Sequence, residues 1–282
     1  MKFLITGSGG CVCTPKPLCQ CSVCVEARKK GYPYKRCGCS LYLEDCALLV
    51  DTPEDISEAL NNADIKKVDN ILYSHCDPDH TLGMRIVEQL RLEWLDYCDN
   101  IKPETPINVY AQTRVMDDIN KIRSSYGSFM DYYEYMGLVR RTAVKKPLFI
   151  NDIKISFVSV RTDKAVSVFV FEEKGKKLVY APCDCMPFPD DEIIKNADVL
   201  IIGNTVVGNV LKNGKIITEE HPLLKELHTV NGVIEIAEKM NIKSVIITHI
   251  EEDWGKSYED YLELQKQYDN VKFAFDGMRI EL

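Results

Sequence analysis

Histidine and tryptophan are scarce in this chain, and long apolar runs are missing. The 282 residues include 5 histidines and 2 tryptophans. No segment approaches the roughly 20 consecutive apolar residues that a membrane-spanning helix needs, so we expect no membrane span. The N-terminal apolar run is too short for a secretory signal and turns into glycines at once. We therefore expect a cytoplasmic protein.

Basic runs are missing as well. The chain has 35 Lys and Arg against 43 Asp and Glu, a net charge of −8, so we expect no nucleic-acid partner. A small anionic substrate remains compatible with this charge, because a bound metal ion supplies local positive charge. The sequence shows no linker or repeat. It predicts a single domain over residues 1–282 and allows assembly as a homodimer.

Cysteine, by contrast, is abundant. Seven of the 12 cysteines lie within residues 11–39, and such clustering in a long chain favours metal ligation in a reducing compartment over disulfides. The spacing Cys19-x-Cys21-x-x-Cys24 predicts a zinc knuckle that needs a fourth ligand. Buried free thiols or an iron–sulfur site are weaker interpretations. The thiols that could supply the fourth ligand are Cys11, Cys13, Cys37 and Cys39.

Short runs rich in Val and Ile predict buried strands that end at polar residues. These strands cover residues 68–74, 178–181, 199–203 and 244–248, and alternation at 153–160 and 165–172 predicts a strand pair. Apolar spacings of three and four predict helices at 81–96, 113–126, 190–196 and 232–240. We expect long loops or insertions at 100–106 and 124–141. This order favours a two-sheet sandwich covered by helices.

The strongest signal for chemistry is the turn His75-Cys76-Asp77-Pro78-Asp79-His80, directly after a predicted strand. Imidazole and carboxylate groups together suit zinc, manganese or iron. A solvated acidic turn at the start of a helix would explain Asp79, but not the two flanking histidines. We therefore interpret His75, Asp77, Asp79 and His80 as metal ligands.

Two further strands also end in candidate ligands. His249 follows the strand at 244–248 and is a predicted ligand, with a hydrogen-bonded core histidine as the alternative. Asp184 follows the strand at 178–181, where its carboxylate could bridge two metals, and a turn aspartate is the alternative. Cys183 and Cys185 beside it could also ligate, which would favour softer metals. His228 is either a catalytic acid or an ordinary surface residue.

These motifs together resemble the PhnP branch of the metallo-β-lactamase superfamily. The other matching features are Gly7-Ser8-Gly9-Gly10, Cys39-Ser40, Leu49-Val50-Asp51, Thr248-His249 and Phe275-Asp276-Gly277-Met278. The resemblance spans the chain, with an insertion expected around residues 90–150 and the zinc knuckle at 11–39. It implies an α+β fold, the metallo-β-lactamase αββα four-layer sandwich, with a dinuclear metal cavity at one edge. Relatives hydrolyse phosphodiesters, including cyclic ribose phosphates.

The resemblance also implies roles for individual residues. His75 and Asp77 would hold one metal, and Asp79, His80 and His249 the second. Asp184 would bridge the two metals. The structural zinc would use Cys19, Cys21 and Cys24.

Three positions depart from the family pattern. Asp77 stands where relatives have a second histidine, and Arg161, Thr162 and Asp163 occupy the turn that holds the family's middle histidine. Glu252 stands at the position of the fourth structural-zinc ligand, which is a histidine in relatives. Fewer imidazoles and an added carboxylate make manganese or iron more plausible than zinc. We therefore expect one or two active-site metals (Zn, Mn or Fe) and one structural Zn, with Glu252 as a candidate ligand.

The function that these residues favour is metal-dependent hydrolysis of a small phosphodiester by a metal-activated water. Asp79 would orient or deprotonate the water, and His228 would protonate the leaving group. Arg161 or Lys164 would bind the substrate anion. The stretch from Asp77 to Gly83 is also similar to PqqB, which makes an iron-dependent oxidoreductase the alternative. A non-catalytic relative with a degenerate metal site is the third interpretation.

Overall fold

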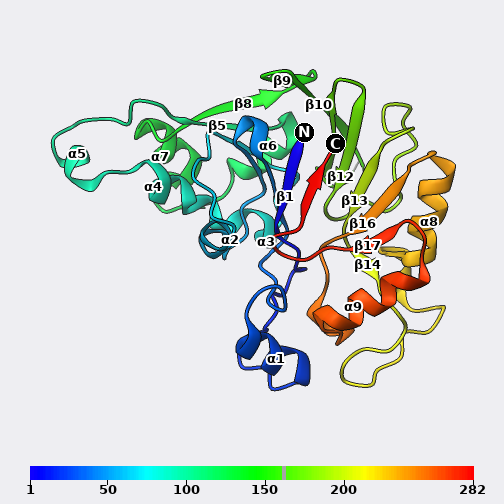
Figure 1. Ribbon diagram of the computed structural model, residues 1–282. Coiled ribbons are helices and arrows are strands. Elements are labelled where there is room, and N and C mark those ends of the chain that lie inside the picture. The colour runs from blue at the N-terminus through cyan, green and yellow to red at the C-terminus, as the bar shows by residue number, and fades with distance from the viewer. Residues whose placement is uncertain (161–162) are drawn as a thin grey trace.

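The chain folds into two β-sheets that pack face to face between two layers of helices (Figure 1). The computed structural model describes residues 1–160 and 163–282. The first sheet has the strand order β18-β1-β2-β3-β4-β5-β8. Its strands are β1 (Lys2–Gly7), β2 (Ser40–Leu43), β3 (Leu48–Val50), β4 (Asn70–Leu72), β5 (Ile107–Gln112), β8 (Val139–Val144) and β18 (Arg279–Glu281).

The second sheet has the strand order β17-β16-β13-β12-β11-β10-β9. Its strands are β9 (Leu148–Ile150), β10 (Ile153–Ser159), β11 (Ser167–Glu173), β12 (Lys176–Ala181), β13 (Val199–Ile202), β16 (Ser244–Ile247) and β17 (Val271–Phe273). The strands from β12 to β17 are parallel, and β3, β4, β5 and β8 are parallel in the first sheet. The predicted αββα sandwich is confirmed.

The space between the two sheets is filled by fully buried aromatic and aliphatic side chains. Phe3 and Leu43 from the first sheet contribute to the same cluster as Phe169 and Phe171 from the second. The rings of Phe3 and Phe171 meet edge to face with centroids 5.4 Å apart. Removing a side chain of this size from water stabilises the fold by roughly 1.5–3 kcal/mol, so this layer supports the rigid sheet ends described below.

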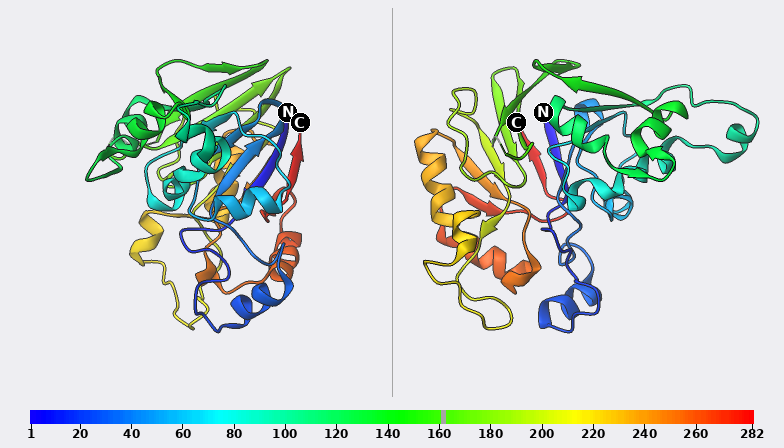
Figure 2. Two further views of the ribbon diagram at one scale, coloured as in Figure 1. Left: turned by 90° about the vertical axis from the view of Figure 1, so that its left-hand side faces the viewer. Right: turned by 180° about the vertical axis from the view of Figure 1, so that it is seen from behind.

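Helices cover the outer face of each sheet (Figure 2). The first sheet is covered by α2 (Ile56–Asn62), α4 (Ile86–Arg91), α6 (Thr113–Ile119) and α7 (Phe129–Tyr135), and the second by α8 (Val230–Lys239) and α9 (Tyr258–Leu264). The helix α1 (Ser22–Lys30) lies beyond the sheets at the bottom of Figure 1. No helix in the described part of the chain is long and apolar enough to span a membrane.

Shorter elements connect these layers. The helical ones are α3 (Pro78–Thr81), α5 (Trp94–Cys98), η1 (Glu44–Cys46), η2 (Leu82–Arg85), η3 (Pro222–Lys225), η4 (Glu252–Trp254) and η5 (Gln265–Gln267). The pairs β6 (Arg123–Ser124) with β7 (Gly127–Ser128) and β14 (Thr205–Val206) with β15 (His228–Thr229) form two small sheets.

Most of the predicted elements are present. The four predicted buried strands correspond to β4, β12, β13 and β16, the strand pair to antiparallel β10 and β11, and the helices at 113–126 and 232–240 to α6 and α8. The helix α6 is shorter than predicted, because the chain turns into β6 at Arg123.

Three predicted segments differ from the structure. The helix at 81–96 is broken into α3, η2, α4 and α5, because Gly83 packs on the chain at Pro53, where an added Cβ would lie 1.9 Å from a carbonyl oxygen. Residues 190–196 form turns, and Nζ of Lys177 donates hydrogen bonds to the carbonyl oxygens of Ile193 and Lys195. Residues 124–141 are not a loop, since they contain β7, α7 and the start of β8.

The parallel strands end at a common edge of the sandwich, where ligand sites of such sheets usually lie. Asp51 follows β3, and the turn that starts at His75 follows β4. On the second sheet, Cys183 follows β12 and His249 follows β16. The fold therefore brings residues separated by almost two hundred positions to one place.

Candidate metal centre

Donor atoms from both sheets converge at one largely buried site, which we call the cavity. His75, His80 and Cys183 form one group, and Asp79, His80 and His249 form another, with the donor atoms of each group within 4.8 Å of one another. The rings of His75 and His80 have centroids 4.2 Å apart, and those of His80 and His249 are stacked at 5.3 Å. Because His80 belongs to both groups, the two form one centre.

The two histidines of the first group have ring nitrogens that are buried without a hydrogen-bond partner. These atoms are Nε2 of His75 and Nε2 of His80. Unsatisfied buried polar atoms are rare in folded proteins and indicate a missing ligand or ion. Imidazole nitrogens are borderline donors that suit zinc and iron, so these residues fit a divalent metal.

The opposite ring nitrogens are held by the protein. Nδ1 of His80 lies 2.9 Å from Oδ2 of Asp51, and Nδ1 of His75 lies 2.9 Å from Oγ of Ser74. Asp51 is fully buried and also accepts hydrogen bonds from the backbone N–H of Ser74 at 2.8 Å and from its hydroxyl at 2.6 Å. A buried carboxylate behind a ligating histidine fixes its ring and raises its basicity. The sequence indicated Asp51 only as a family feature, without a role.

Asp79 links the two imidazoles of the second group. Its Oδ2 lies 3.2 Å from Nε2 of His249 and 3.5 Å from Nε2 of His80. Burial raises the pKa of the Asp79 carboxyl, but the hydrogen bond from His249 and the charge of His80 outweigh it and hold the pKa below its usual range. Behind His249, Oε1 of Glu251 lies 3.3 Å from Nδ1 and accepts from the backbone N–H of Cys11 at 3.1 Å.

The backbone around the cavity is held in unusual conformations. Asp51, Asp184, Asn204 and His249 all have positive φ values, of 63°, 49°, 50° and 50°. For residues with a side chain this costs of order 1–3 kcal/mol each, and such strain concentrates at functional sites. These backbone conformations are consistent with a site in which several side chains must point toward one ion or ligand.

The structure brings Cys183 into the cavity in place of Asp184. Cys183 is 5% exposed and is a donor of the first group, whereas Oδ2 of Asp184 accepts a hydrogen bond from Nζ of Lys164 at 2.5 Å. Asp184 belongs to neither group. The two neighbouring side chains therefore have different partners, Cys183 the imidazoles and Asp184 the ammonium group of Lys164. The predicted bridging carboxylate is therefore not among the assembled donors.

The remaining predicted residues lie at the margin of the cavity. Oδ2 of Asp77 is 3.6 Å from Nε2 of His75, but its side chain is half exposed. His228 belongs to neither donor group, and its Nε2 lies 3.1 Å from the carbonyl oxygen of Cys185. Burial lowers the pKa of His228, against the opposing effect of this hydrogen bond. Arg161 lies outside the described residues.

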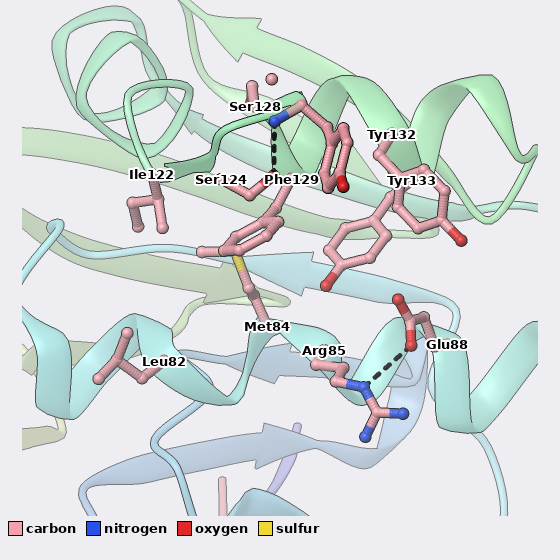
Figure 3. A pocket seen from close by; sticks show the side chains of 12 residues that line it. Leu82, Met84, Arg85, Glu88, Ile122, Ser124, Ser128, Phe129, Tyr132 and Tyr133 are labelled. Carbon is pink, nitrogen blue, oxygen red and sulfur yellow. Dashed lines mark hydrogen bonds and ion pairs between the residues drawn. The ribbon is translucent and has the colours of Figure 1, made fainter.

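Two pockets flank the chain segment that carries the histidine turn. A charged pocket of about 500 Å³ opens beside His75 and Asp77. Its lining mixes basic and acidic side chains, which are Arg114, Lys121 and Lys164 and Asp117, Asp118 and Asp163. A more apolar pocket of about 590 Å³ lies against Met84 and the aromatic rings of α7 (Figure 3). The salt bridge between Arg85 and Glu88 closes one side of the apolar pocket, so its lining offers little free charge.

The cysteine knuckle assembles as a second group of candidate ligands. The sulfurs of Cys19, Cys21 and Cys24 lie 3.7, 3.5 and 2.8 Å from Oε1 of Glu252. Tetrahedral zinc with Zn–S bonds of about 2.3 Å needs ligand atoms separated by roughly 3.5–3.8 Å, so Cys19 and Cys21 already fit zinc, and the contact of Cys24 with Glu252 would have to lengthen by about 0.7 Å. The alternative fourth thiols are not part of the group.

Lys212 was not foreseen as part of the knuckle. Its Nζ contacts Oε2 of Glu252 and lies 3.7 Å from Sγ of Cys19. Three thiolates and a carboxylate carry more negative charge than one divalent cation neutralises, and the lysine reduces this excess. Lys212 is far from the knuckle in sequence, so no spacing could have indicated it.

A sequence profile of the Beta-lactamase superfamily domain matches residues 47–250. The chain belongs to this superfamily. As a member of this superfamily, the chain is a metal-dependent hydrolase. The profile match begins after the knuckle, so the knuckle is additional to the matched region. A search of curated protein sequences finds no match.

Solved structures show the same fold over the whole chain. A diphosphatase from the PhnP family has a TM-score of 0.72 at 22% identity, covering 100% of this chain and 96% of that one. Zn²⁺-bound PqqB from Methylobacterium extorquens has a TM-score of 0.72 at 18% identity, with 100% of both chains covered. The short form of human tRNase Z has a TM-score of 0.62 at 16% identity, covering 100% and 99%.

Proposed function

We propose that this protein hydrolyses a small phosphodiester at the cavity formed by His75, Asp79, His80 and His249. The observation that carries this proposal is the pair of buried, unpartnered Nε2 atoms of His75 and His80, which face a shared space beside a carboxylate. A divalent metal held there supplies a Lewis acid that polarises a phosphoryl oxygen and lowers the pKa of water. The PhnP-family neighbour, a diphosphatase, supports testing phosphate esters first.

Asp79 is placed to orient the attacking water. Its Oδ2 lies 3.2 Å from Nε2 of His249, within the same donor group as His80. We therefore assign Asp79 to accepting a hydrogen bond from a metal-bound water.

His228 is the proposed proton donor to the leaving group. Its ring is positioned by the carbonyl of Cys185, two residues after Cys183. Because burial lowers its pKa, protonated His228 is a stronger acid than an exposed histidine but is scarce at neutral pH. Its contribution is therefore expected to grow as the pH falls.

The charged pocket beside His75 is the proposed substrate site. Its volume of about 500 Å³ suits a small molecule. A phosphodiester anion bound there would take the place of the carboxylates that pair with Lys121 and Lys164. The apolar pocket of Figure 3 is less suited to phosphate, because its lining is mainly aliphatic and aromatic and includes none of the metal-donor residues. The twelve free thiols support a reducing, cytoplasmic location.

The test is hydrolysis by protein that has been stripped of metal and reloaded separately with zinc, manganese or ferrous iron. The substrates are bis(p-nitrophenyl) phosphate and 2′,3′-cyclic nucleotides, and the control is H221A, which changes a histidine outside both donor groups. We expect turnover with at least one metal in wild type and in H221A. Absence of turnover with all three metals would refute the proposal, and oxygen uptake with ferrous iron would favour an oxidoreductase instead.

A further inference from the structure

Cys183 is the one thiol in the described part of the chain that is grouped with the cavity imidazoles. Its sulfur lies within 4.8 Å of the donor nitrogens of His75 and His80, and the residue is 5% exposed. Nδ2 of Asn204 donates a hydrogen bond to the sulfur at 3.0 Å. The sulfur therefore already acts as a hydrogen-bond acceptor in this site.

The chain is built to bring Cys183 this close. Gly203 ends β13 between Pro182 and His249, and an added Cβ there would lie 1.6 Å from the Pro182 oxygen and 2.7 Å from Cβ of His249. A side chain at 203 would thus separate the end of β12 from His249. Because residue 203 is a glycine, the ends of β12 and β16 can approach each other. The sulfur of Cys183 then lies close to the cavity histidines.

The neighbouring cysteine does not share this position. Sγ of Cys185 donates a hydrogen bond to the carbonyl oxygen of Cys183 at 2.9 Å, and Cys185 belongs to no donor group. The side chain of Asp184 is engaged with Lys164. Of the three consecutive residues that could ligate, only Cys183 is directed at the cavity.

We propose that Cys183 ligates the cavity metal as a thiolate, together with His75 and His80. This inference rests on the proposed function, because it requires a metal in the same cavity. Metal binding replaces the S–H bond by a sulfur–metal bond and releases the proton to solvent. A thiolate is a soft ligand, so the site selects zinc, cobalt or ferrous iron over manganese and magnesium. The sequence left both preferences open, since the departures from the family pattern favour manganese or iron and ligation by Cys183 favours softer metals.

Cadmium-113 NMR of cadmium-loaded protein tests the inference directly, because the resonance position reports the number of sulfur ligands. We expect two resonances in wild type, one from the three-thiolate knuckle and one, further upfield, from the cavity. In C183S the cavity resonance shifts further upfield or is lost, while the knuckle resonance stays in place and shows that the protein is folded. The matched control C185S leaves both resonances unchanged.

A second variant separates ligation from packing. In C183D a hard ligand replaces the soft one, so the cavity should bind manganese more tightly relative to zinc than wild type does, measured by competition with a chelator. The inference is overturned if C183S leaves both resonances in place, or if wild type shows the knuckle resonance alone. Both outcomes are independent of turnover. If the cavity resonance shifts in C183S but wild type has no phosphodiesterase activity, the proposed function is refuted and the assignment of Cys183 as a ligand stands.

Discussion

The knuckle and the cavity are two metal-ligand clusters of opposite construction. In the knuckle, three ligands come from six consecutive residues and one from Glu252, and a lysine reduces the excess negative charge. In the cavity, the donors come from the ends of three strands in two sheets and border an open pocket. A closed, sulfur-rich cluster suits a structural ion, whereas a cluster that opens on one side leaves room for a substrate. The comparison predicts that the cavity can lose its metal while the knuckle keeps its own.

The largest effect is expected for H80A, which removes the imidazole shared by both groups of the cavity. Loss of the metal removes several kcal/mol of transition-state stabilisation, so turnover should fall about 10³-fold or more. Elemental analysis should show loss of the cavity metal with the knuckle metal retained. Unchanged turnover in H80A, with H221A as the control, would show that the cavity is not the active site.

The next effect is expected for C24A, which removes the most buried of the three knuckle thiols. Loss of a structural metal should lower the free energy of unfolding by about 3 kcal/mol or more, measured by urea unfolding. C98A, which changes an exposed free thiol, is the control. If C24A loses the knuckle metal but unfolds like wild type, the knuckle has a role other than stability.

A smaller effect is expected for D51N, behind His80. The amide cannot replace the carboxylate that accepts from both Ser74 and His80, so cavity affinity should fall about 10- to 100-fold. Chelator competition gives the affinity of each site separately. Equal weakening of the knuckle would mean that the substitution disturbs the whole fold rather than one ligand.

The smallest effect is a pH dependence that comes from His228. Burial lowers its pKa in the folded state, so its contribution to stability is complete above the unfolded value of about 6.5 and is lost as the pH falls through the folded value. Between pH 7 and pH 5, wild type should lose stability relative to H228Q by less than about 1 kcal/mol. Parallel unfolding curves at all pH values would contradict the assignment.

The difference between the clusters also explains how far the sequence could be read. The spacing of Cys19, Cys21 and Cys24 is enough to predict the knuckle, and the pattern of strands is enough to predict the sandwich. For the cavity, the turn from His75 to His80 is local and was identified. Whether Cys183 or Asp184 faces inward depends on the direction of one side chain at a strand end, which composition does not encode. The helix predicted at 81–96 was wrong because of another tertiary contact that the sequence does not show, the close packing of Gly83 on Pro53.

Glu251 and Glu252 are adjacent, yet the first touches His249 and the second touches the three knuckle thiols. One peptide bond thus separates the two ion sites, and the carboxylate that anchors the knuckle ion also fixes the neighbour that steadies a catalytic imidazole. If the knuckle holds zinc, an oxidant that removes this zinc would also free Glu252 and, through the adjacent peptide bond, loosen the contact of Glu251 with His249. Hydrolysis at the cavity would then depend on the redox state of the knuckle thiols.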